Sequence, residues 1–272
     1  MTSERPVITF LSDYGLQDDF VGICHGVIAM LCPEARVIDI SHGIPRQDVR
    51  AGALVLAASI PYMPAGVHLA VVDPDVGAQR RAVALRLADG RVLVGPDNGL
   101  LWPAAQHFGG VAEAVDIAHS PFRLEPVSAT FHGRDIFAPV AALLAAGAAL
   151  PEAGRPLDPG ELVSLELPRP RLQDGWLVAH ALYVDRFGNV QLDAEHEDLE
   201  GSGLRLGRGV QLRDASGGSH TCPFVRTFAD VEPGSLLLYE DAYRRLAIAV
   251  SRGDAAGRLG VRVDDELWIA PT

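Results

Sequence analysis

Four short stretches of the sequence place acidic side chains or a histidine next to apolar runs. Carboxylate and imidazole groups can hold a water molecule or accept its proton, and a guanidinium can stabilise a developing anion. Such residue types at the ends of strands predict a site for polar chemistry. The stretches are SDYGLQDD (12–19), VVDPDVGAQRR (71–81), PDNGLL (96–101) and TFHGRD (130–135).

A purely structural interpretation competes with this one at each stretch. An acid after a strand commonly closes a turn, as Asp13 and Asp73 can do here. Arg80 can be a solvated surface side chain, and a single histidine such as His132 is more often structural than catalytic. Asp18 can begin a helix. Both interpretations stay open on local sequence alone.

The first half of the chain has the pattern of an α/β domain. Short apolar runs alternate with longer segments of helical periodicity, which favours a largely parallel sheet. In open α/β sheets, ligands bind outside the carboxyl ends of the strands, where Asp13 is expected. The expected strands are 7–11, 36–40, 67–72 and two around Asp89-Gly90. The expected helices are 19–31, 48–60 with Asp48 as N-cap, and one from Gly133 with Asp135 as a cap, which Gly147 ends as its C′ residue.

The composition changes after about residue 150. Five prolines between 151 and 170 interrupt any helical period, and short β-like runs separated by glycine, aspartate and serine follow. We therefore predict an α/β nucleoside-binding and catalytic domain at 1–150, a Pro-rich linker at 151–172 and a smaller all-β domain at 173–272.

Composition and absent motifs exclude several function classes. A formal net charge of -12 argues against a nucleic-acid partner. The start of the chain has no signal-peptide pattern, and no apolar run is long enough to span a membrane, so a cytoplasmic location is expected. The three cysteines have no C-x-x-C spacing, which disfavours disulfides and structural zinc. Glycine-rich phosphate-binding loops and a G-x-S-x-G elbow are missing from the sequence.

A metal centre is a further alternative for the same stretches. Their acids and histidine are metal-ligand types, but no metal-binding motif spacing groups them, so we predict no metal. The residues in question are Asp13, Asp73, His132 and Asp135.

Taken together, five motifs resemble one enzyme family. SDYGLQDDFVG, VVDPDVGAQRR, PDNGLL, TFHGRDIFAP and DRFGNV occur in this order between residues 12 and 190. The chain resembles the S-adenosyl-L-methionine (SAM) hydroxide adenosyltransferases, or adenosine-forming SAM hydrolases, which are related to fluorinases and chlorinases. The resemblance spans about residues 6 to 265 and implies a Rossmann-like domain followed by a barrel-like β domain.

The resemblance also implies a reaction, an assembly and residue roles. The reaction is SAM plus water giving adenosine and L-methionine, with no cofactor, in a homotrimer whose sites lie between subunits. The implied catalytic set is Asp73, Arg80 and His132. The implied substrate-binding residues are Asp13 for the ribose hydroxyls, Asp18 and Asp185 near the methionine amine, Phe187 and Asn189 on the adenine side, and Tyr243 and Val250.

Two other functions remain as alternatives, a SAM-dependent halogenase and a non-catalytic adenosine- or SAM-binding protein. Halogenases of this group carry a serine where this chain has Gly133 and an insertion where it has the tight Asp89-Gly90 turn. The chain departs from the family at Asp75, usually glycine, and at His25, often lysine. A family N-S-x-G stretch that contacts the methionine carboxylate reads Asp241-Ala242-Tyr243-Arg244 here, which makes Arg244 or Arg245 the candidate for that contact.

Overall fold

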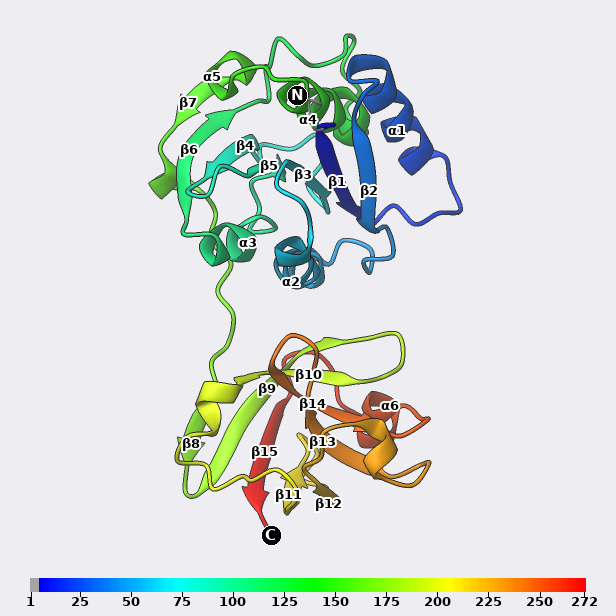
Figure 1. Cartoon of the computed structure of the whole chain (residues 1–272), viewed down its shortest axis with the longest axis vertical. Helices are drawn as coiled ribbons and strands as arrows, with labels where there is room; N and C mark the ends of the chain where they lie inside the picture. Colours follow the sequence, from blue (N-terminus) through cyan, green and yellow to red (C-terminus); the bar gives the residue numbers. More distant parts are fainter. Residues whose placement is uncertain (1–4) are drawn as a thin grey trace. The chain divides into compact units, whose positions relative to one another are not determined.

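The apolar runs of the first half form one seven-stranded sheet. The computed structural model describes residues 5–272, and its chain divides into a first unit that ends at Leu165 and a second unit, Glu166–Thr272 (Figure 1). The strand order of the first sheet is β2-β1-β3-β5-β4-β6-β7. Its strands are β1 (Val7–Ser12), β2 (Arg36–Ser41), β3 (Val67–Val71), β4 (Ala82–Leu87), β5 (Val92–Pro96), β6 (Val111–Asp116) and β7 (Arg155–Leu157).

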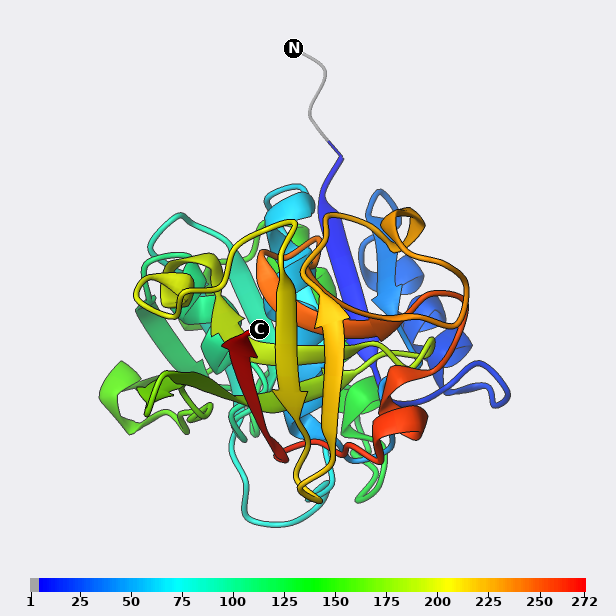
Figure 2. The ribbon, with the colours of Figure 1, turned by 90° about the horizontal axis from the view of Figure 1, so that it is seen from below.

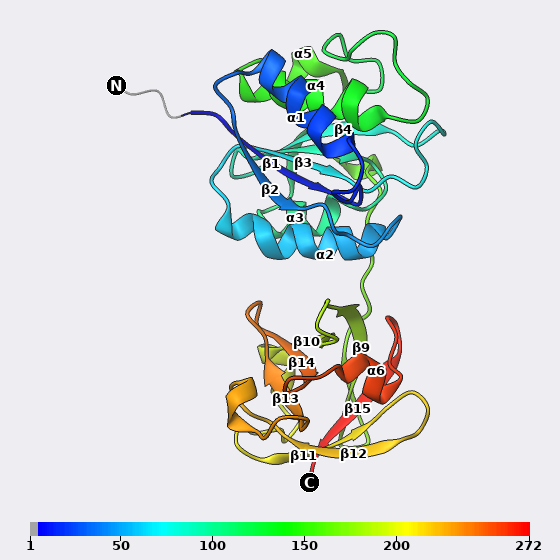
Figure 3. The ribbon, with the colours of Figure 1, turned by 90° about the vertical axis from the view of Figure 1, so that its right-hand side faces the viewer.

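Helices cover both faces of this sheet. Figure 3 shows α1, α4 and α5 on one side and α2 and α3 on the other. The four strands β2, β1, β3 and β5 are parallel, and the remaining strands pair antiparallel. The helices are α1 (Phe20–Leu31), α2 (Val49–Ser59), α3 (Trp102–His107), α4 (Ala138–Ala145) and α5 (Leu150–Ala153), with short helical turns η1 (Ile60–Tyr62), η2 (Gly133–Phe137) and η3 (Pro159–Glu161).

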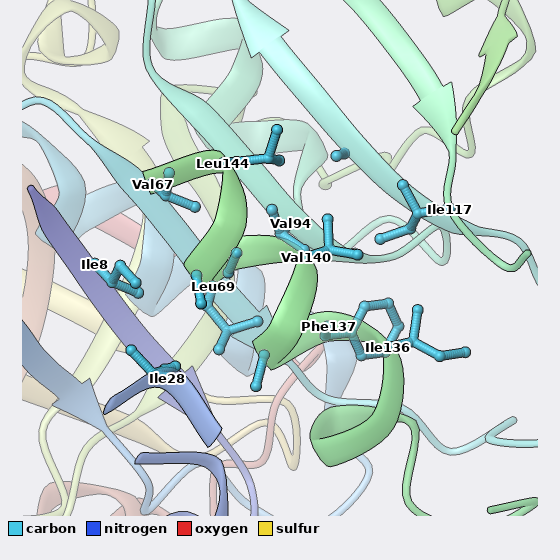
Figure 4. Packing of buried hydrophobic residues seen from close by; sticks show 14 of the residues in the cluster. Ile8, Ile28, Val67, Leu69, Val94, Ile117, Ile136, Phe137, Val140 and Leu144 are labelled. Atoms are coloured by element: carbon cyan, nitrogen blue, oxygen red, sulfur yellow. The ribbon is translucent and has the colours of Figure 1, made fainter. Parts of the chain in front are cut away.

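The core of the first unit lies between the parallel strands and α4. Figure 4 shows Ile8 of β1, Leu69 of β3 and Val94 of β5 near Phe137 and Val140. All five side chains are fully buried, and each contributes roughly 1.5–3 kcal/mol relative to an exposed position. This packing fixes the start of the η2–α4 segment, which carries His132, against the sheet.

Local predictions for the helix ends gave mixed outcomes. Asp48 is confirmed as an N-cap, because its carboxylate accepts the Ala51 N–H at 2.8 Å. Gly147 follows the end of α4 with φ of 106°. The expected helix caps at Asp18 and Asp135 are wrong: α1 begins after Asp19, and Asp135 lies buried inside η2, where its carboxylate binds Arg134 and the Ser128 N–H. Because the Asp135 carboxylate already accepts these hydrogen bonds, it is not available to cap the N-terminus of the helix.

Most of the stretch after residue 150 belongs to the first unit, and part of it joins the first sheet. Within the expected linker, β7 pairs with β6 at the sheet edge, with Pro156 opposite Val115. An edge strand tolerates proline because one side of it needs no backbone donor. The compact first unit therefore continues to Leu165.

The second unit is an antiparallel, nearly closed barrel. Its strand order is β12-β11-β15-β9-β10-β14-β13, with β8 beside β9. The two end strands approach each other where Val225 donates to the Leu238 carbonyl at 2.9 Å. The elements are β8 (Arg171–Gln173), β9 (Trp176–Val184), β10 (Val190–Glu195), η4 (His196–Leu199), β11 (Gly209–Arg213), β12 (Ser219–Pro223), η5 (Phe228–Asp230), β13 (Leu236–Glu240), β14 (Arg245–Val250), α6 (Ala255–Leu259) and β15 (Glu266–Pro271).

The predicted fold class, an α/β domain followed by a smaller all-β domain, is confirmed. The hairpin around Asp89-Gly90 forms between β4 and β5 as expected. In Figure 2, β11 and β12 run side by side, with β15 next to β11. Among the described residues, the structure contains no helix that is both long and apolar enough to cross a membrane.

Candidate active site

The parallel register brings the first two polar stretches together. β1 pairs with β3 so that Ser12 lies opposite Val71, and the chain leaves both strands at the same sheet edge. Asp13 and Asp73 therefore begin neighbouring loops. The stretch after β5 joins them, since the Asn98 side chain donates to the Val72 carbonyl at 2.9 Å. Three of the four sequence motifs thus meet at the carboxyl ends of adjacent strands.

Arg80 folds back onto Asp73 as a buried ion pair. Its Nε lies 2.9 and 3.0 Å from the two carboxylate oxygens, and Nη2 makes a second contact with Oδ2. Both side chains are more than nine-tenths buried. The guanidinium also lies over the Phe137 ring, 5.2 Å from its centroid. The surface-arginine interpretation is therefore wrong, because this charge is enclosed and paired.

His132 joins the pair from the other side. Arg80 Nη2 donates to His132 Nδ1 at 2.9 Å, although the two residues are 52 positions apart. Burial lowers the pKa of His132, and the positive charge of Arg80 lowers it further. Because arginine only donates, Nδ1 accepts, and the neutral ring carries its proton on Nε2. His132 thus presents an N–H donor away from Arg80.

The glycine after His132 is required by a residue that sequence reasoning missed. A Cβ at position 133 would overlap the Tyr14 hydroxyl and lie 3.1 Å from Cζ of the same ring. Burial raises the pKa of Tyr14 well above its ordinary value, and nearby Cys24, Asp13 and Asp73 raise it further. The phenol therefore keeps its proton beside His132. Only the folded contact between SDYG and FHG reveals this role, since each motif alone contains an ordinary tyrosine or glycine.

Asp13 and Asp18 occupy different settings. Asp13 Oδ2 accepts the backbone N–H of Gln47 at 2.8 Å, which ties the loop after β1 to the loop before α2. Asp18 is exposed, between that loop and α1. The structure thus places the Asp13 loop beside the Asp73 loop, whereas Asp18 lies on the exposed segment before α1.

In the second unit, three of the predicted residues line one pocket. It has a volume of about 480 Å³. The exposed ring of Phe187 stands at its edge, on a turn that Asp185 closes by accepting the N–H groups of Phe187 and Asn189 at 2.8 and 3.0 Å. The lining residues are Phe187, Asn189, Phe228, Val250, Arg252 and Gly253.

Tyr243 lies on the turn between β13 and β14. Asp241 Oδ1 accepts the N–H groups of Tyr243 and Arg245 at 2.8 and 3.0 Å, so this acid organises the turn. Arg244 adopts a φ of 64°, a left-handed conformation that glycine takes without strain and other residues take at about 1–2 kcal/mol. Arg244 stands where the family N-S-x-G stretch has glycine, and the backbone here still has the conformation that favours glycine.

Comparisons with known proteins agree with these motifs. The (R)-S-adenosyl-L-methionine hydrolase of Salinispora tropica is 51% identical over 97% of each chain, and that of Thermus thermophilus is 38% identical over 95% of this chain and 96% of the relative. The fluorinase of an Actinoplanes species is 31% identical over 90% and 91%. A crystal structure of an uncharacterized conserved protein from Thermotoga maritima, 35% identical, superposes with a TM-score of 0.89 over 97% of this chain and 99% of the other.

Models of two domains match the two units separately. Residues 8–154 match the SAM hydroxide adenosyltransferase N-terminal domain, and residues 179–268 match the C-terminal domain of the same name. These matches cover the Asp73–Arg80–His132 cluster and the pocket beside Phe187. The chain therefore belongs to the SAM hydroxide adenosyltransferase family.

Proposed function

We propose that this protein hydrolyses SAM to adenosine and L-methionine by attack of water or hydroxide at the ribose C5′. The observation that carries the proposal is the enclosed cluster of Asp73, Arg80 and His132 beside Asp13. Curated relatives of up to 51% identity, covering nearly the whole chain, are named (R)-SAM hydrolases, which supports the same reaction. No cofactor is needed for this chemistry.

The chemistry of the substrate explains why such a site is enough. Bond formation between the water oxygen and C5′ expels methionine as a neutral thioether, which needs no proton, so a general acid is unnecessary. One water proton stays on the new 5′-hydroxyl, and the other leaves to solvent. Holding the nucleophile in line with the C5′–S bond can contribute up to about 7–11 kcal/mol. Excluding bulk water also helps, because charge is lost when an anion attacks a sulfonium.

Each member of the cluster has a distinct proposed role. The Nε2–H of His132 donates to the oxygen of the nucleophile and orients it. The charge of Arg80 favours hydroxide character, and Asp73 holds Arg80 in place. Because Nδ1 of His132 is occupied by Arg80, the imidazole acts here as a donor, not as the acceptor of the water proton.

The halogenase alternative is disfavoured by one contact. Relatives at 31% and 32% identity are named fluorinases, so this chemistry must be weighed. Halogenases of this group carry serine at the position of Gly133, and here any Cβ would overlap the Tyr14 hydroxyl. The serine of the halogenases therefore does not fit beside Tyr14 as it lies here, so the site lacks the group that contacts the halide in those enzymes.

Residues of both units contribute to the proposed substrate binding. Phe187, Asn189 and Val250 line one pocket, which suits the flat adenine ring. Following the family pattern, we assign the ribose hydroxyls to Asp13 and the methionine end to Asp18, Asp185 and Tyr243. A cytoplasmic homotrimer with sites shared between subunits belongs to the same proposal. Light scattering tests the trimeric state, for which the expected mass is three times that of the 29.0 kDa chain.

A direct assay tests the function. Purified protein is incubated with SAM, and adenosine and methionine are followed by chromatography, with and without chloride or fluoride and with and without a chelator. We expect adenosine in every condition. A 5′-halo-5′-deoxyadenosine product would establish the halogenase, and SAM binding without product would establish a non-catalytic binding protein. Loss of activity with chelator would indicate a metal-dependent hydrolase.

A further inference from the structure

We propose that His25, Asp39 and His42 form a binding site for a divalent cation of the zinc type, separate from the Asp73–Arg80–His132 cluster. The three side chains come from α1, β2 and the loop after β2. Their ligand atoms all lie within 4.8 Å of one another. The proposal concerns residues to which the hydrolysis mechanism assigns no role.

The two imidazoles converge on one carboxylate oxygen. His25 Nε2 lies 2.9 Å and His42 Nε2 lies 3.1 Å from Asp39 Oδ1. Around zinc, with metal–ligand bonds of about 2.0–2.2 Å, tetrahedral ligand atoms lie about 3.3–3.5 Å apart. A cation therefore fits after the side chains move by a few tenths of an ångström.

His42 is held in the orientation that a metal ligand needs. Its side chain is buried, and its Nδ1 lies 2.7 Å from the hydroxyl of Ser12, which is also fully buried. A hydrogen bond at one ring nitrogen is the usual way in which proteins orient the other toward a metal. The ring of Phe10 packs edge-on against His42, with centroids 4.7 Å apart, and limits its rotation.

The second observation that points to a ligand is the setting of His42 Nε2, which is buried and in ion-pair range of Asp39 but makes no hydrogen bond within the described residues. A buried polar atom without such a bond is costly. A cation between the two imidazoles and the carboxylate would satisfy all three groups at once.

The donor set selects the class of cation. Two imidazole nitrogens and one carboxylate suit zinc and similar first-row ions better than magnesium or calcium, which prefer oxygen ligands. The side chains of His25 and Asp39 are 37% and 42% exposed, so an ion can enter from solvent and water can complete its coordination.

A bound cation would brace the loop that carries Asp13. The His42 carbonyl accepts the Gly15 N–H at 2.7 Å, and the Ser12 hydroxyl accepts the Tyr14 N–H at 3.3 Å. The cation would thus join α1 and β2 to the loop after β1. Since it binds the folded state, it would also raise the unfolding temperature.

The test measures zinc binding in the absence of SAM, so it is independent of the proposed hydrolysis. The full chain and its variants compete with a chromophoric chelator for Zn²⁺, and Co²⁺ is then added as a spectroscopic probe of the ligand geometry. His25→Ala and Asp39→Asn alter partly exposed ligands and should fold. His196→Ala is the matched control, because within residues 5–272 His196 pairs with a single acid, Glu240, at 2.8 Å.

We expect one zinc per chain, binding at least about tenfold weaker in both site variants, and unchanged binding in the control. Co²⁺ should give the intense visible absorption of a four-coordinate site in the wild type only. Two results would overturn the proposal. One is the absence of saturable zinc uptake by the wild type, and the other is equal affinity in the wild type and both site variants.

Discussion

The two units hold their candidate residues in opposite ways. In the first unit, Asp73, Arg80 and His132 bind one another, and the ion pair at their centre is buried. In the second unit, Asp185 and Asp241 bind the backbone of their own turns, and the aromatic rings on those turns are exposed.

Under the proposed function, this difference corresponds to a division between fixing the nucleophile and holding the substrate. Groups that bind each other in a dry setting are already oriented and lose little freedom during reaction. Exposed rings on ordered turns instead offer area to a ligand or another surface. We therefore expect substitutions in the Asp73–Arg80–His132 cluster to lower kcat and substitutions on the exposed turns of the second unit to raise KM.

The largest expected effect follows from breaking the first cluster. His132→Ala and Asp73→Ala should each lower kcat at least about a hundredfold in the adenosine-release assay, the usual cost of removing an oriented donor or the group that positions a charge. Asp73→Ala also leaves Arg80 buried without its acid, which typically costs 3–5 kcal/mol of stability, so turnover is compared at a temperature where both variants are folded.

His119→Ala is the control for that experiment. His119 is an exposed histidine of the same unit that contacts Arg123, and its loss should leave kcat unchanged. Near-wild-type turnover in both His132→Ala and Asp73→Ala would remove the cluster from the mechanism and break the contrast between the units.

A smaller effect is expected from crowding the cluster without removing any member. Gly133→Ala places a methyl group against Tyr14, so Tyr14 or the backbone next to His132 must shift, and a misplacement near 1 Å can cost up to about a hundredfold. We expect a loss of at least about tenfold in kcat. Tyr14→Phe deletes the hydroxyl that the new methyl group would overlap, so the double variant should regain part of the lost kcat. Equal rates in the single and double variants would show that the Tyr14 contact is not the cause.

The sequence predicted the fold class and the strand ends well, for identifiable reasons. Periodicity and turn residues are local, so the strands near Val7 and Val67 and the N-cap Asp48 could be read directly. The contact of Arg80 with His132 spans 52 positions and depends on strand register and on packing of η2. Local pattern left the roles of those residues ambiguous, and only the family resemblance implied a catalytic role for them.

Other features follow only from tertiary contacts. Tyr14 has no pattern that distinguishes it until Gly133 lies against it. Asp135 resembles a helix cap in sequence, but Arg134 and the Ser128 N–H occupy its carboxylate. Pro156 suggests a linker in the sequence but lies in the edge strand β7, because proline is typical of linkers and of edge strands alike.

The second unit should respond more weakly and in a different parameter. Phe187→Ala removes an exposed ring from the edge of the pocket, so we expect KM for SAM to rise about tenfold while kcat changes by less than about threefold. Leu206→Ala, an exposed apolar residue outside this pocket, serves as the control. A fall in kcat with unchanged KM would place Phe187 with the reacting groups and contradict the division between the units.

The smallest expected effect concerns the pH dependence of His132. The proposed mechanism needs the neutral ring, because protonation at Nδ1 would remove the acceptor for Arg80 and place two positive charges together. Burial and Arg80 both lower the pKa of His132, so protonation occurs below the ordinary value of about 6.5. As pH falls from 8 to 6.5, kcat/KM should therefore lose less than about half its value, and the steeper loss should come at lower pH. Arg80→Gln removes the second cause of the lowered pKa, so NMR titration of His132 in this variant should show a higher midpoint than in the wild type. An unchanged midpoint would mean that Arg80 does not act on the imidazole electrostatically, and only burial would then keep His132 neutral.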